Sequence, residues 1–177
     1  MLIMMAGLPG TGKSTLAKEL ARLLPGFVLS KDVIRATLFP KPYIEYSTQQ
    51  DDFCVKIILE TAEYLLAKYP HEYVILDGRT FSKRYQVDQV VKVATRLNTP
   101  LKVIECVVSD ETAKARIAQD FQQGTHVAAN RTPELYAASK PRFEPIELPK
   151  LVLDTEQPLE VCVDACIRHI RQFSRES

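Results

Sequence analysis

The strongest constraint on the fold is a glycine-rich run near the start of the chain, Gly7, Leu8, Pro9, Gly10, Thr11, Gly12, Lys13 and Ser14. It follows an apolar segment, Leu2 to Ala6, whose length and composition predict a buried β-strand. After the run, leucines recur at the spacing of one helical face, at Leu16, Leu20, Leu23 and Leu24. These three segments predict a strand, a tight loop and a helix in direct succession.

The composition of this loop is typical of a phosphate cradle, G-x-x-x-x-G-K-[ST]. Glycines let successive backbone N–H groups turn towards one anion, and the start of the following helix adds its positive dipole end. Lys13 can reach β- and γ-phosphates, and the Ser14 hydroxyl can ligate Mg²⁺. We therefore predict that ATP and Mg²⁺ bind along Gly7 to Thr15, with a structural role for Thr15.

Apolar runs and amphipathic stretches alternate along the rest of the chain. Strands are expected at Leu2 to Ala6, Phe27 to Ser30, Tyr73 to Asp77, Leu101 to Val108 and Lys150 to Asp154. Helices are expected between them, and Thr132 followed by Pro133 indicates the start of one. This alternation predicts an α/β fold with a parallel sheet. Because no repeat or Gly/Ser-rich linker interrupts it, residues 1–177 are expected to form one domain.

Asp77 is the expected partner of Ser14 at the metal. It ends the apolar run Val74-Ile75-Leu76-Asp77, and an acid in this place holds Mg²⁺ through water beside a phosphate cradle. The pattern is short and common, so a plain strand-terminal aspartate is the alternative.

A second pair of chemistry-bearing residues, Asp32 and Arg35, lies three positions apart in Ser30-Lys31-Asp32-Val33-Ile34-Arg35. This spacing places both side chains on one side of a short helix. Phosphoryl transfer to a hydroxyl needs a group that accepts the proton and a cation near the transferring charge. Asp32 can accept the proton, and Arg35 can hold an acceptor phosphate or the transferring group. The alternative is a helix-terminal role for Asp32 and a surface position for Arg35.

Three motifs together, G-L-P-G-T-G-K-S-T-L-A, S-K-D-V-I-R and V-I-L-D-G, resemble the P-loop kinases of small molecules and polynucleotide 5′-hydroxyls. The Asp32 and Arg35 pair is similar to the S-x-D-x-x-R element of polynucleotide kinases, which implies Asp32 as general base and Arg35 as a contact to an acceptor-side phosphate. Gluconate, shikimate and adenylylsulfate kinases and zeta-toxin-like proteins share the scaffold with other acceptor elements. The resemblance implies a P-loop NTPase fold: a five-stranded parallel sheet of order 2-3-1-4-5, flanking helices and a helical lid.

Kinases of this group close a lid that carries arginines over the γ-phosphate, which implies a lid at about residues 117–145. Arg131 and Arg116 are the expected transition-state cations, and a solvated helix charge is the alternative for each. Family members often have a further arginine one turn after Arg116, where this chain has Gln119 and Asp120. The lid chemistry of this chain therefore departs from the family pattern.

Charge and cysteine content exclude several other classes of protein. With 23 Lys and Arg against 22 Asp and Glu, the chain does not resemble a nucleic-acid coat protein or a polybasic membrane binder. The stretch between Gly78 and Arg96 has an excess of basic residues, which indicates a solvated helix face more than a surface that binds a polynucleotide. Two of these residues, Arg79 and Arg84, can still line an acceptor cleft. The acidic stretch from Glu45 to Glu63 would repel a nucleic acid.

The four cysteines, Cys54, Cys106, Cys162 and Cys166, do not have the spacing of a disulfide framework or a zinc ribbon. They are expected to be small buried residues in a reducing compartment. The alternative is a metal-binding or redox pair, since the C-x3-C spacing of Cys162 and Cys166 puts both thiols on one helical face. No run has membrane-spanning length, and the apolar start lacks a cationic leader. A cytoplasmic protein without a membrane partner is therefore expected.

The expected function is an ATP-dependent kinase that transfers the γ-phosphoryl group to a hydroxyl of a small molecule or a polynucleotide 5′ end. The alternative is a module that binds or hydrolyses ATP as a switch and phosphorylates no acceptor. A GTPase-type switch is disfavoured because no N-K-x-D element follows a strand. The sequence names neither the acceptor nor the oligomeric state.

Overall fold

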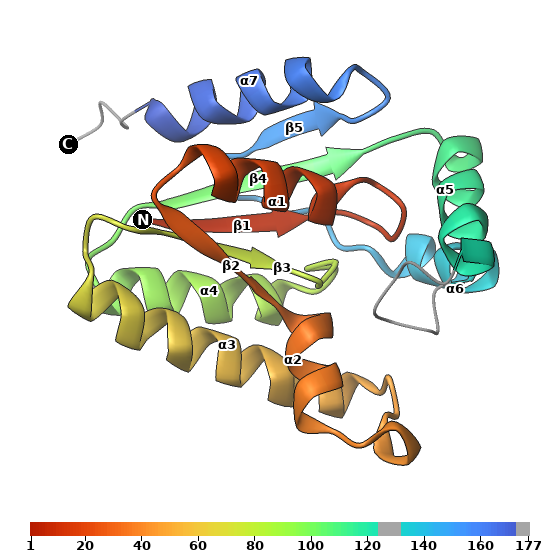
Figure 1. Ribbon diagram of the computed structural model, residues 1–177, viewed down its shortest axis with the longest axis horizontal. Coiled ribbons are helices and arrows are strands. Elements are labelled where there is room, and N and C mark those ends of the chain that lie inside the picture. The colour runs from red at the N-terminus through yellow and green to blue at the C-terminus, as the bar shows by residue number, and fades with distance from the viewer. Residues whose placement is uncertain (124–131, 173–177) are drawn as a thin grey trace.

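The computed structural model describes residues 1–123 and 132–172 (Figure 1). Within them, five strands form one parallel sheet in the order β2-β3-β1-β4-β5, which confirms the predicted topology. The strands are β1 (Leu2–Ala6), β2 (Gly26–Ser30), β3 (Tyr73–Asp77), β4 (Leu101–Val107) and β5 (Leu151–Asp154). Each expected strand is present, and its ends differ from the expected ones by at most one residue.

The helices that connect these strands are α1 (Lys13–Leu23), α2 (Lys31–Leu38), α3 (Thr48–Lys68), α4 (Arg84–Arg96), α5 (Asp110–Gln123), α6 (Pro133–Ser139) and α7 (Leu159–Arg171). Two short 3₁₀ helices, η1 (Lys41–Tyr43) and η2 (Lys140–Arg142), follow α2 and α6. The expected cap of α6 is confirmed, because the Thr132 hydroxyl accepts a hydrogen bond from the Leu135 N–H at 3.3 Å.

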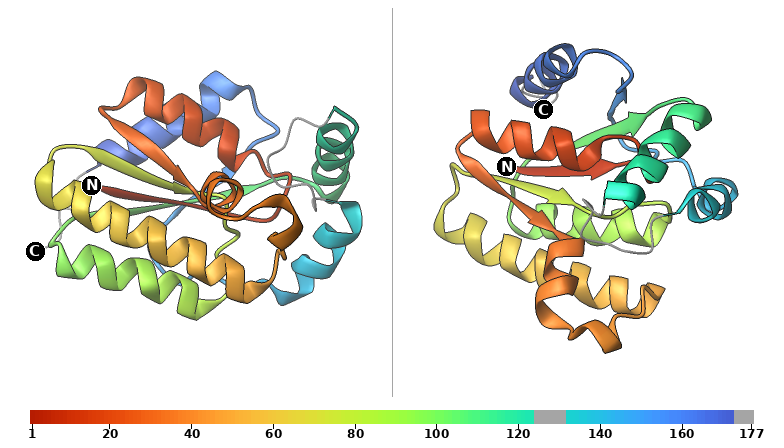
Figure 2. Two further views of the ribbon diagram at one scale, coloured as in Figure 1. Left: turned by 60° about the horizontal axis from the view of Figure 1, so that its bottom comes forward. Right: turned by 45° about the vertical axis from the view of Figure 1, so that its right-hand side comes forward.

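The central strand β1 divides its side chains between two cores. Leu2, Met4 and Ala6 pack on the side of α3 and α4, whereas Ile3 and Met5 pack on the side of α1 and α7. Figures 1 and 2 show these two helical layers on opposite faces of the sheet. Since successive side chains of a strand point to opposite faces, an uninterrupted apolar strand is what a sheet covered on both sides requires.

The carboxyl ends of the strands meet at one edge of the sheet, where α5 and α6 lie beyond the arrowheads (Figure 1). These two helices share a small core of their own, Ala113, Ile117 and Tyr136. They belong to the region expected to form the lid, of which residues 124–131 lie outside the described part of the chain. The helical elements of that region are therefore placed at the edge where parallel α/β sheets bind ligands.

The segment from Pro40 to Thr48 contains η1 and the N-cap of α3, Ser47. The buried side chain of Gln50 connects this segment to α3 by two hydrogen bonds. Gln50 Nε2 donates to the Tyr43 carbonyl at 2.9 Å, and Gln50 Oε1 accepts from the Glu45 N–H at 3.1 Å. Both ends of one amide are thus used to hold the loop in a defined path.

All four cysteines are buried and carry free thiols, as expected. None of the helices in the described part of the chain combines the length and the apolar character needed to cross a bilayer.

Two leucines of α1 offer a matched test of the packing. Leu20 is fully buried between α1 and the sheet, whereas Leu23, on the same helix, is 59% exposed. We expect Leu20→Ala to lower the free energy of unfolding by about 2–5 kcal/mol, because it leaves a cavity in the core. Leu23→Ala should change it by no more than about 0.5 kcal/mol. Chemical denaturation measures both, and equal losses would contradict this packing.

Candidate active site

Three glycines of the loop between β1 and α1 have left-handed backbones. Gly7, Gly10 and Gly12 have φ values of 128°, 77° and 80°. A Cβ atom on Gly7 would lie 2.3 Å from the Cys106 carbonyl oxygen, and one on Gly10 would lie 2.6 Å from the Ala113 carbonyl oxygen. Neither contact leaves room for a side chain, because both neighbours are backbone atoms. The glycine pattern is therefore required by the path of the loop and by its neighbours.

Side-chain hydrogen bonds to backbone carbonyls stabilise the loop. The Leu8 carbonyl oxygen accepts from the Thr11 hydroxyl at 2.8 Å and from Lys13 Nζ at 2.6 Å. From the far edge of the sheet, the Thr155 hydroxyl donates to the Thr11 carbonyl at 3.0 Å. Gly12 forms the N-cap of α1, so the loop leads directly into the positive end of that helix.

Asp77 ends β3 as predicted and is 6% exposed. Its Oδ1 atom is buried and has no hydrogen-bond partner among the described residues. The Gly7 N–H donates to the Thr80 carbonyl at 3.1 Å, which ties the cradle to the loop that follows Asp77.

Ser14 and Asp77 fit an Mg²⁺ ion that is bound together with a nucleotide. They supply a hydroxyl and a carboxylate with an unused oxygen, which are the oxygen ligands that this ion prefers. Across residues 1–123 and 132–172, no cluster of three or more His, Cys, Asp and Glu residues makes a metal site on its own. Mg²⁺ usually takes one or two protein oxygens and completes its shell with phosphates and water.

The buried thiol of Cys106 lies close enough to Lys13 and Asp77 to be affected by both charges. Burial raises its pKa to about 12, Lys13 acts to lower it, and Asp77 acts to raise it further. Both charged side chains therefore lie within electrostatic reach of one buried atom. With so high a pKa the thiol is no nucleophile at neutral pH.

A cavity of about 560 Å³ opens on one side of the loop. Its wall contains the start of α1 and the segment from Thr155 to Cys162 that follows β5. Arg116 of α5 closes this wall: its Nη1 donates to the Thr155 hydroxyl at 3.0 Å and its Nη2 to the Thr155 carbonyl at 2.8 Å. Arg116 thus lies beside the loop after β5, while Arg131, the other expected cation, falls outside the described residues.

A second cavity, of about 440 Å³, opens on the other side of the loop. Pro9 lines this cavity and the adjacent Gly10 lines the first, so the cradle forms the partition between them. Asp32 and Arg35 both line it and are 7% and 2% exposed. Asp32 Oδ1 lies 3.0 Å from Arg35 Nη1. The expectation that α2 presents both side chains on one side is confirmed, and a surface position for Arg35 is wrong.

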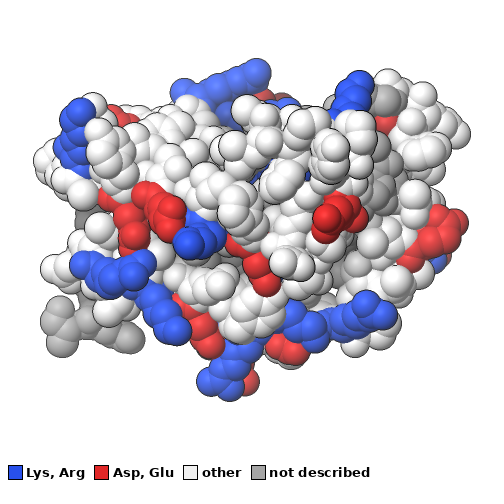
Figure 3. Space-filling view, turned by 90° about the horizontal axis from the view of Figure 1, so that it is seen from below, with Lys and Arg blue, Asp and Glu red and all other residues white. Residues whose placement is uncertain are grey.

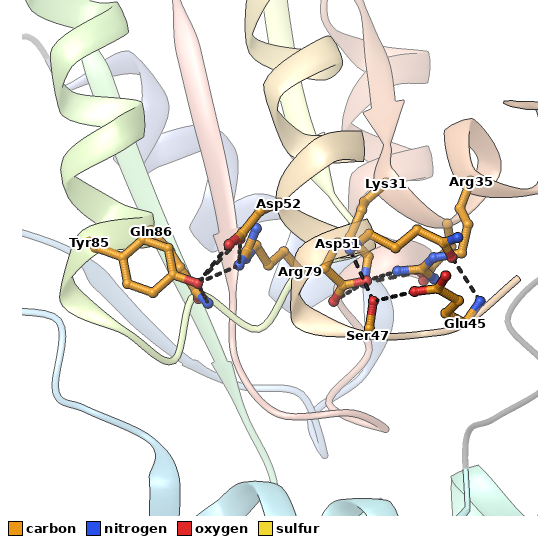
Figure 4. Close-up of polar contacts among 11 residues, drawn as sticks. Lys31, Arg35, Glu45, Ser47, Asp51, Asp52, Arg79, Tyr85 and Gln86 are labelled. Carbon is orange, nitrogen blue, oxygen red and sulfur yellow. Dashed lines mark hydrogen bonds and ion pairs between the residues drawn. The ribbon is translucent and has the colours of Figure 1, made fainter.

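Lys31 and Asp51 complete this charged group (Figure 4). Lys31 Nζ lies 2.9 Å from Asp51 Oδ2 and 3.4 Å from Asp32 Oδ1, and Arg35 forms an ion pair with Asp51 as well. The Tyr46 ring lies 5.0 Å from the Arg35 guanidinium carbon. Tyr46 itself has a left-handed backbone, with φ 52°, on the loop that Gln50 fastens.

A separate polar group lies on the α4 side of the same cavity (Figure 4). Arg79, 5% exposed, forms an ion pair with Asp52 and donates to the Tyr85 hydroxyl at 3.3 Å. The Tyr85 hydroxyl also donates to Asp52 at 3.1 Å. Arg79 lines the cavity, as the sequence allowed, whereas Arg84 is exposed and does not.

The sequence indicated neither Lys31 nor the two aspartates of α3 as site residues. Lys31 stands beside Asp32 but occupies a variable position of the S-x-D-x-x-R pattern, and Asp51 and Asp52 belong to the acidic stretch from Glu45 to Glu63. No local pattern relates Asp51 to α2 or Asp52 to Arg79, because these contacts join segments that are far apart in the sequence.

Burial lowers the pKa of Lys31 to about 8, and the neighbouring Asp32 only partly opposes this shift. Between about pH 8 and 10.5, the unfolded chain therefore binds more protons at Lys31 than the folded chain does. The free energy of unfolding should rise with pH over this interval by linkage.

Urea unfolding at about pH 7.5 and about pH 9.5 tests this prediction. The difference in free energy between the two pH values should shrink in Lys31→Met, which removes the titrating amine. Lys92→Met, at an exposed position of α4, should leave the difference unchanged. Parallel pH dependence in the parent and in Lys31→Met would contradict the shifted pKa.

Comparisons with known proteins agree with the fold. The fold is that of the P-loop kinases, with a phosphate cradle at the carboxyl edge of a parallel sheet. The sequence matches the family model described as an AAA domain over residues 2–146, so the chain belongs to that family. No curated protein matches the sequence.

Three solved structures show the likeness of fold. A candidate kinase from Chloroflexus aurantiacus superposes with a TM-score of 0.74 at 24% identity, over 95% of this chain and 97% of that one. A gluconokinase from Sinorhizobium meliloti gives 0.68 at 17% identity, over 95% and 90%. The adenylylsulfate (APS) kinase CysC of Mycobacterium tuberculosis, in complex with AMPPNP and APS, gives 0.71 at 15% identity, over 97% of both chains.

Proposed function

We propose that this protein is an ATP-dependent kinase that transfers the γ-phosphoryl group of ATP to a hydroxyl group. The observation that carries the proposal is the pair of cavities on the two sides of the cradle. One has room for a nucleotide beside the start of α1, and the other contains Asp32 and Arg35. The cradle between them is where a donor phosphate would meet an acceptor.

In this proposal the backbone N–H groups from Gly7 to Ser14 and the start of α1 hold the phosphates of ATP. Lys13 moves from the Leu8 carbonyl to the β- and γ-phosphates and neutralises charge as the bond to the leaving phosphate breaks. Thr155 supports the cradle through the Thr11 carbonyl. These groups position the donor and require no covalent step on the protein.

Asp32 is the proposed general base, because it is the carboxylate of α2 that lines the acceptor cavity. It takes the proton of the acceptor hydroxyl while that oxygen attacks the γ-phosphorus in line. Arg35 Nη1, 3.0 Å from Asp32 Oδ1, fixes the carboxylate and presents a cation near the transferred group.

Ser14 and Asp77 would hold Mg²⁺, which when bound with ATP neutralises charge on the β- and γ-phosphates. Arg116 is placed by Thr155 on the nucleotide side, where it can contact the bound nucleotide. Arg131 is proposed as the lid cation, from the family pattern alone. The lid over about residues 117–145 would exclude water when it closes.

A nucleotide-dependent switch without an acceptor is less well supported. Such a protein needs no second cavity beside its cradle, and no buried carboxylate at the position of Asp32. Residues of several separate elements line the acceptor cavity, among them α2, α3, the β3–α4 loop, α4, α6 and η2. An arrangement of this kind favours a kinase.

Asp32→Asn tests the general base. We expect it to lower phosphoryl transfer about 10²- to 10⁴-fold, because the amide cannot accept the hydroxyl proton, while ATP binding stays close to that of the parent. Transfer from labelled ATP to sugars, nucleosides, antibiotics and an oligonucleotide with a free 5′-hydroxyl provides the measurement. Asp88→Asn, on the exposed side of α4, is the control. Transfer at the parent rate in Asp32→Asn would rule out this role.

Lys13→Ala tests the cradle. The loss of the ammonium group should weaken binding of Mg-ATP by roughly 10- to 100-fold and lower transfer as well, because a charged hydrogen bond to the phosphates is lost. Calorimetry measures the binding, and Lys92→Ala provides a control at an exposed lysine. Unchanged affinity and transfer would remove Lys13 from the mechanism.

A further inference from the structure

We infer that the acceptor is a small hydroxy acid, a molecule with both a hydroxyl and a carboxylate or phosphate, and that Arg79 and Arg142 bind its acidic group. The inference rests on the proposed kinase function and narrows its substrate class. It depends on which charges of the acceptor cavity are already neutralised by the protein and which are not.

The cations nearest to Asp32 are neutralised within the protein. Lys31 and Arg35 both pair with Asp32 and Asp51. On the rim, Lys83 pairs with Glu144 at 2.8 Å. Three cations and three carboxylates make up these groups, so they do not by themselves select an anion.

Arg79 has binding capacity left. Its Nη2 atom serves both Asp52 and Tyr85, but its Nη1 atom is buried and has no hydrogen-bond partner within the described residues. Arg79 is only 5% exposed, so its guanidinium has lost most of its hydration. A buried donor without a hydrogen-bond partner leaves this loss of free energy uncompensated. The Asp52 carboxylate is 35% exposed and is shared with Tyr85, so it neutralises Arg79 incompletely.

Arg142 adds a cation that the described protein does not neutralise. It lines the cavity from η2, on the side of α6, and is exposed. No ion pair involves it in the part of the chain that the structure describes. Planar guanidinium groups are well suited to carboxylates and phosphates, because both oxygens of such a group can be bound at once.

Gln86 supplies a complementary acceptor. Its side chain is buried in the same wall, where its Nε2 atom donates to the Tyr85 hydroxyl at 3.3 Å. Its Oε1 atom has no partner among the described residues and can accept a hydrogen bond from a ligand hydroxyl. A wall with an unsatisfied cationic donor and a neighbouring unsatisfied acceptor matches a hydroxy acid better than a neutral polyol.

Gly78 brings the loop that carries Arg79 close to Asp32. In the proposed acceptor, the acidic group and the reacting hydroxyl therefore cannot be far apart. This glycine has φ 87°, and a Cβ atom on it would lie 3.0 Å from the Lys31 N atom and 3.1 Å from the Asp32 N atom. The loop that carries Arg79 therefore lies directly against the backbone of Asp32. One small molecule can contact both residues.

Three features favour a small molecule over a polynucleotide. The cavity, about 440 Å³, is in the range of small-ligand sites. Residues of α6, Leu135, Ala138 and Ser139, line it together with η2, α2 and α3, so it is bounded by several elements. The face shown in Figure 3 has positive and negative side chains interspersed, without the continuous positive track that a phosphate backbone would need.

Paired acceptors test the inference. Transfer from labelled ATP is measured for gluconate against glucitol, glycerate against glycerol, glucose 6-phosphate against glucose, and an oligonucleotide with a free 5′-hydroxyl. We expect an acid to be phosphorylated and its neutral partner to react at least about tenfold more slowly at equal concentration. The first two pairs report on a carboxylate and the third on a phosphate.

Arg79→Gln should raise the KM for that acid roughly 10- to 100-fold with a smaller change in kcat, because a charged hydrogen bond is lost in binding. Its KM for ATP should stay that of the parent. Arg79→Lys, which keeps the charge, should recover part of the loss. Arg84→Gln, five positions along the chain and outside the cavity wall, is the matched control and should behave as the parent.

Calorimetry on protein loaded with Mg-AMPPNP provides a second readout, in which the same acids and neutral partners are titrated. Equal or better use of a neutral partner, preference for the oligonucleotide, an unaltered KM in Arg79→Gln, or no heat and no transfer with any acid would each overturn the inference. If ATP still binds and some neutral hydroxyl is phosphorylated, the proposed kinase function survives. Absence of ATP binding would overturn the kinase function itself.

Discussion

The close packing of the cradle against its neighbours is the constraint on which the rest of this structure depends. Gly7 and Gly10 bring the loop within van der Waals reach of the backbone at Cys106 and Ala113, so the loop is held between β1, β4 and α5. That contact fixes where α1 begins and where its positive end points. It also fixes the partition between the two cavities, because adjacent residues, Pro9 and Gly10, face opposite sides.

The acceptor side is organised by charges that come from separate elements. Asp32 and Arg35 belong to α2, Asp51 and Asp52 to α3, and Arg79 to the loop after β3. Each buried cation contacts at least one carboxylate, which offsets part of the cost of removing it from water. The pairing is tight around Asp32 and looser around Arg79. In the proposed kinase, this difference would give the cavity a reacting end at Asp32 and a substrate-binding end at Arg79.

Much of this architecture could be predicted from residue patterns. The apolar run Leu2–Ala6 and the cradle motif were sufficient for the strand, loop and helix, and alternation along the chain for the parallel sheet. Asp32 and Arg35 could be found because a helix places positions three apart on one side. Asp51, Asp52 and Tyr46 could not, because their contacts join segments that no local periodicity relates. The direction of Arg116 towards Thr155 likewise depends on tertiary packing.

The hydrogen bond from Lys13 to the Leu8 carbonyl has a consequence for ligand selectivity. A lysine that already donates within its own loop must exchange that oxygen for one of the ligand, so a single oxyanion brings little net gain. A longer polyphosphate compensates for the exchange, since it engages the loop amides and the ammonium together. Under the proposed function, short inorganic anions would therefore bind this loop more weakly than nucleoside triphosphates.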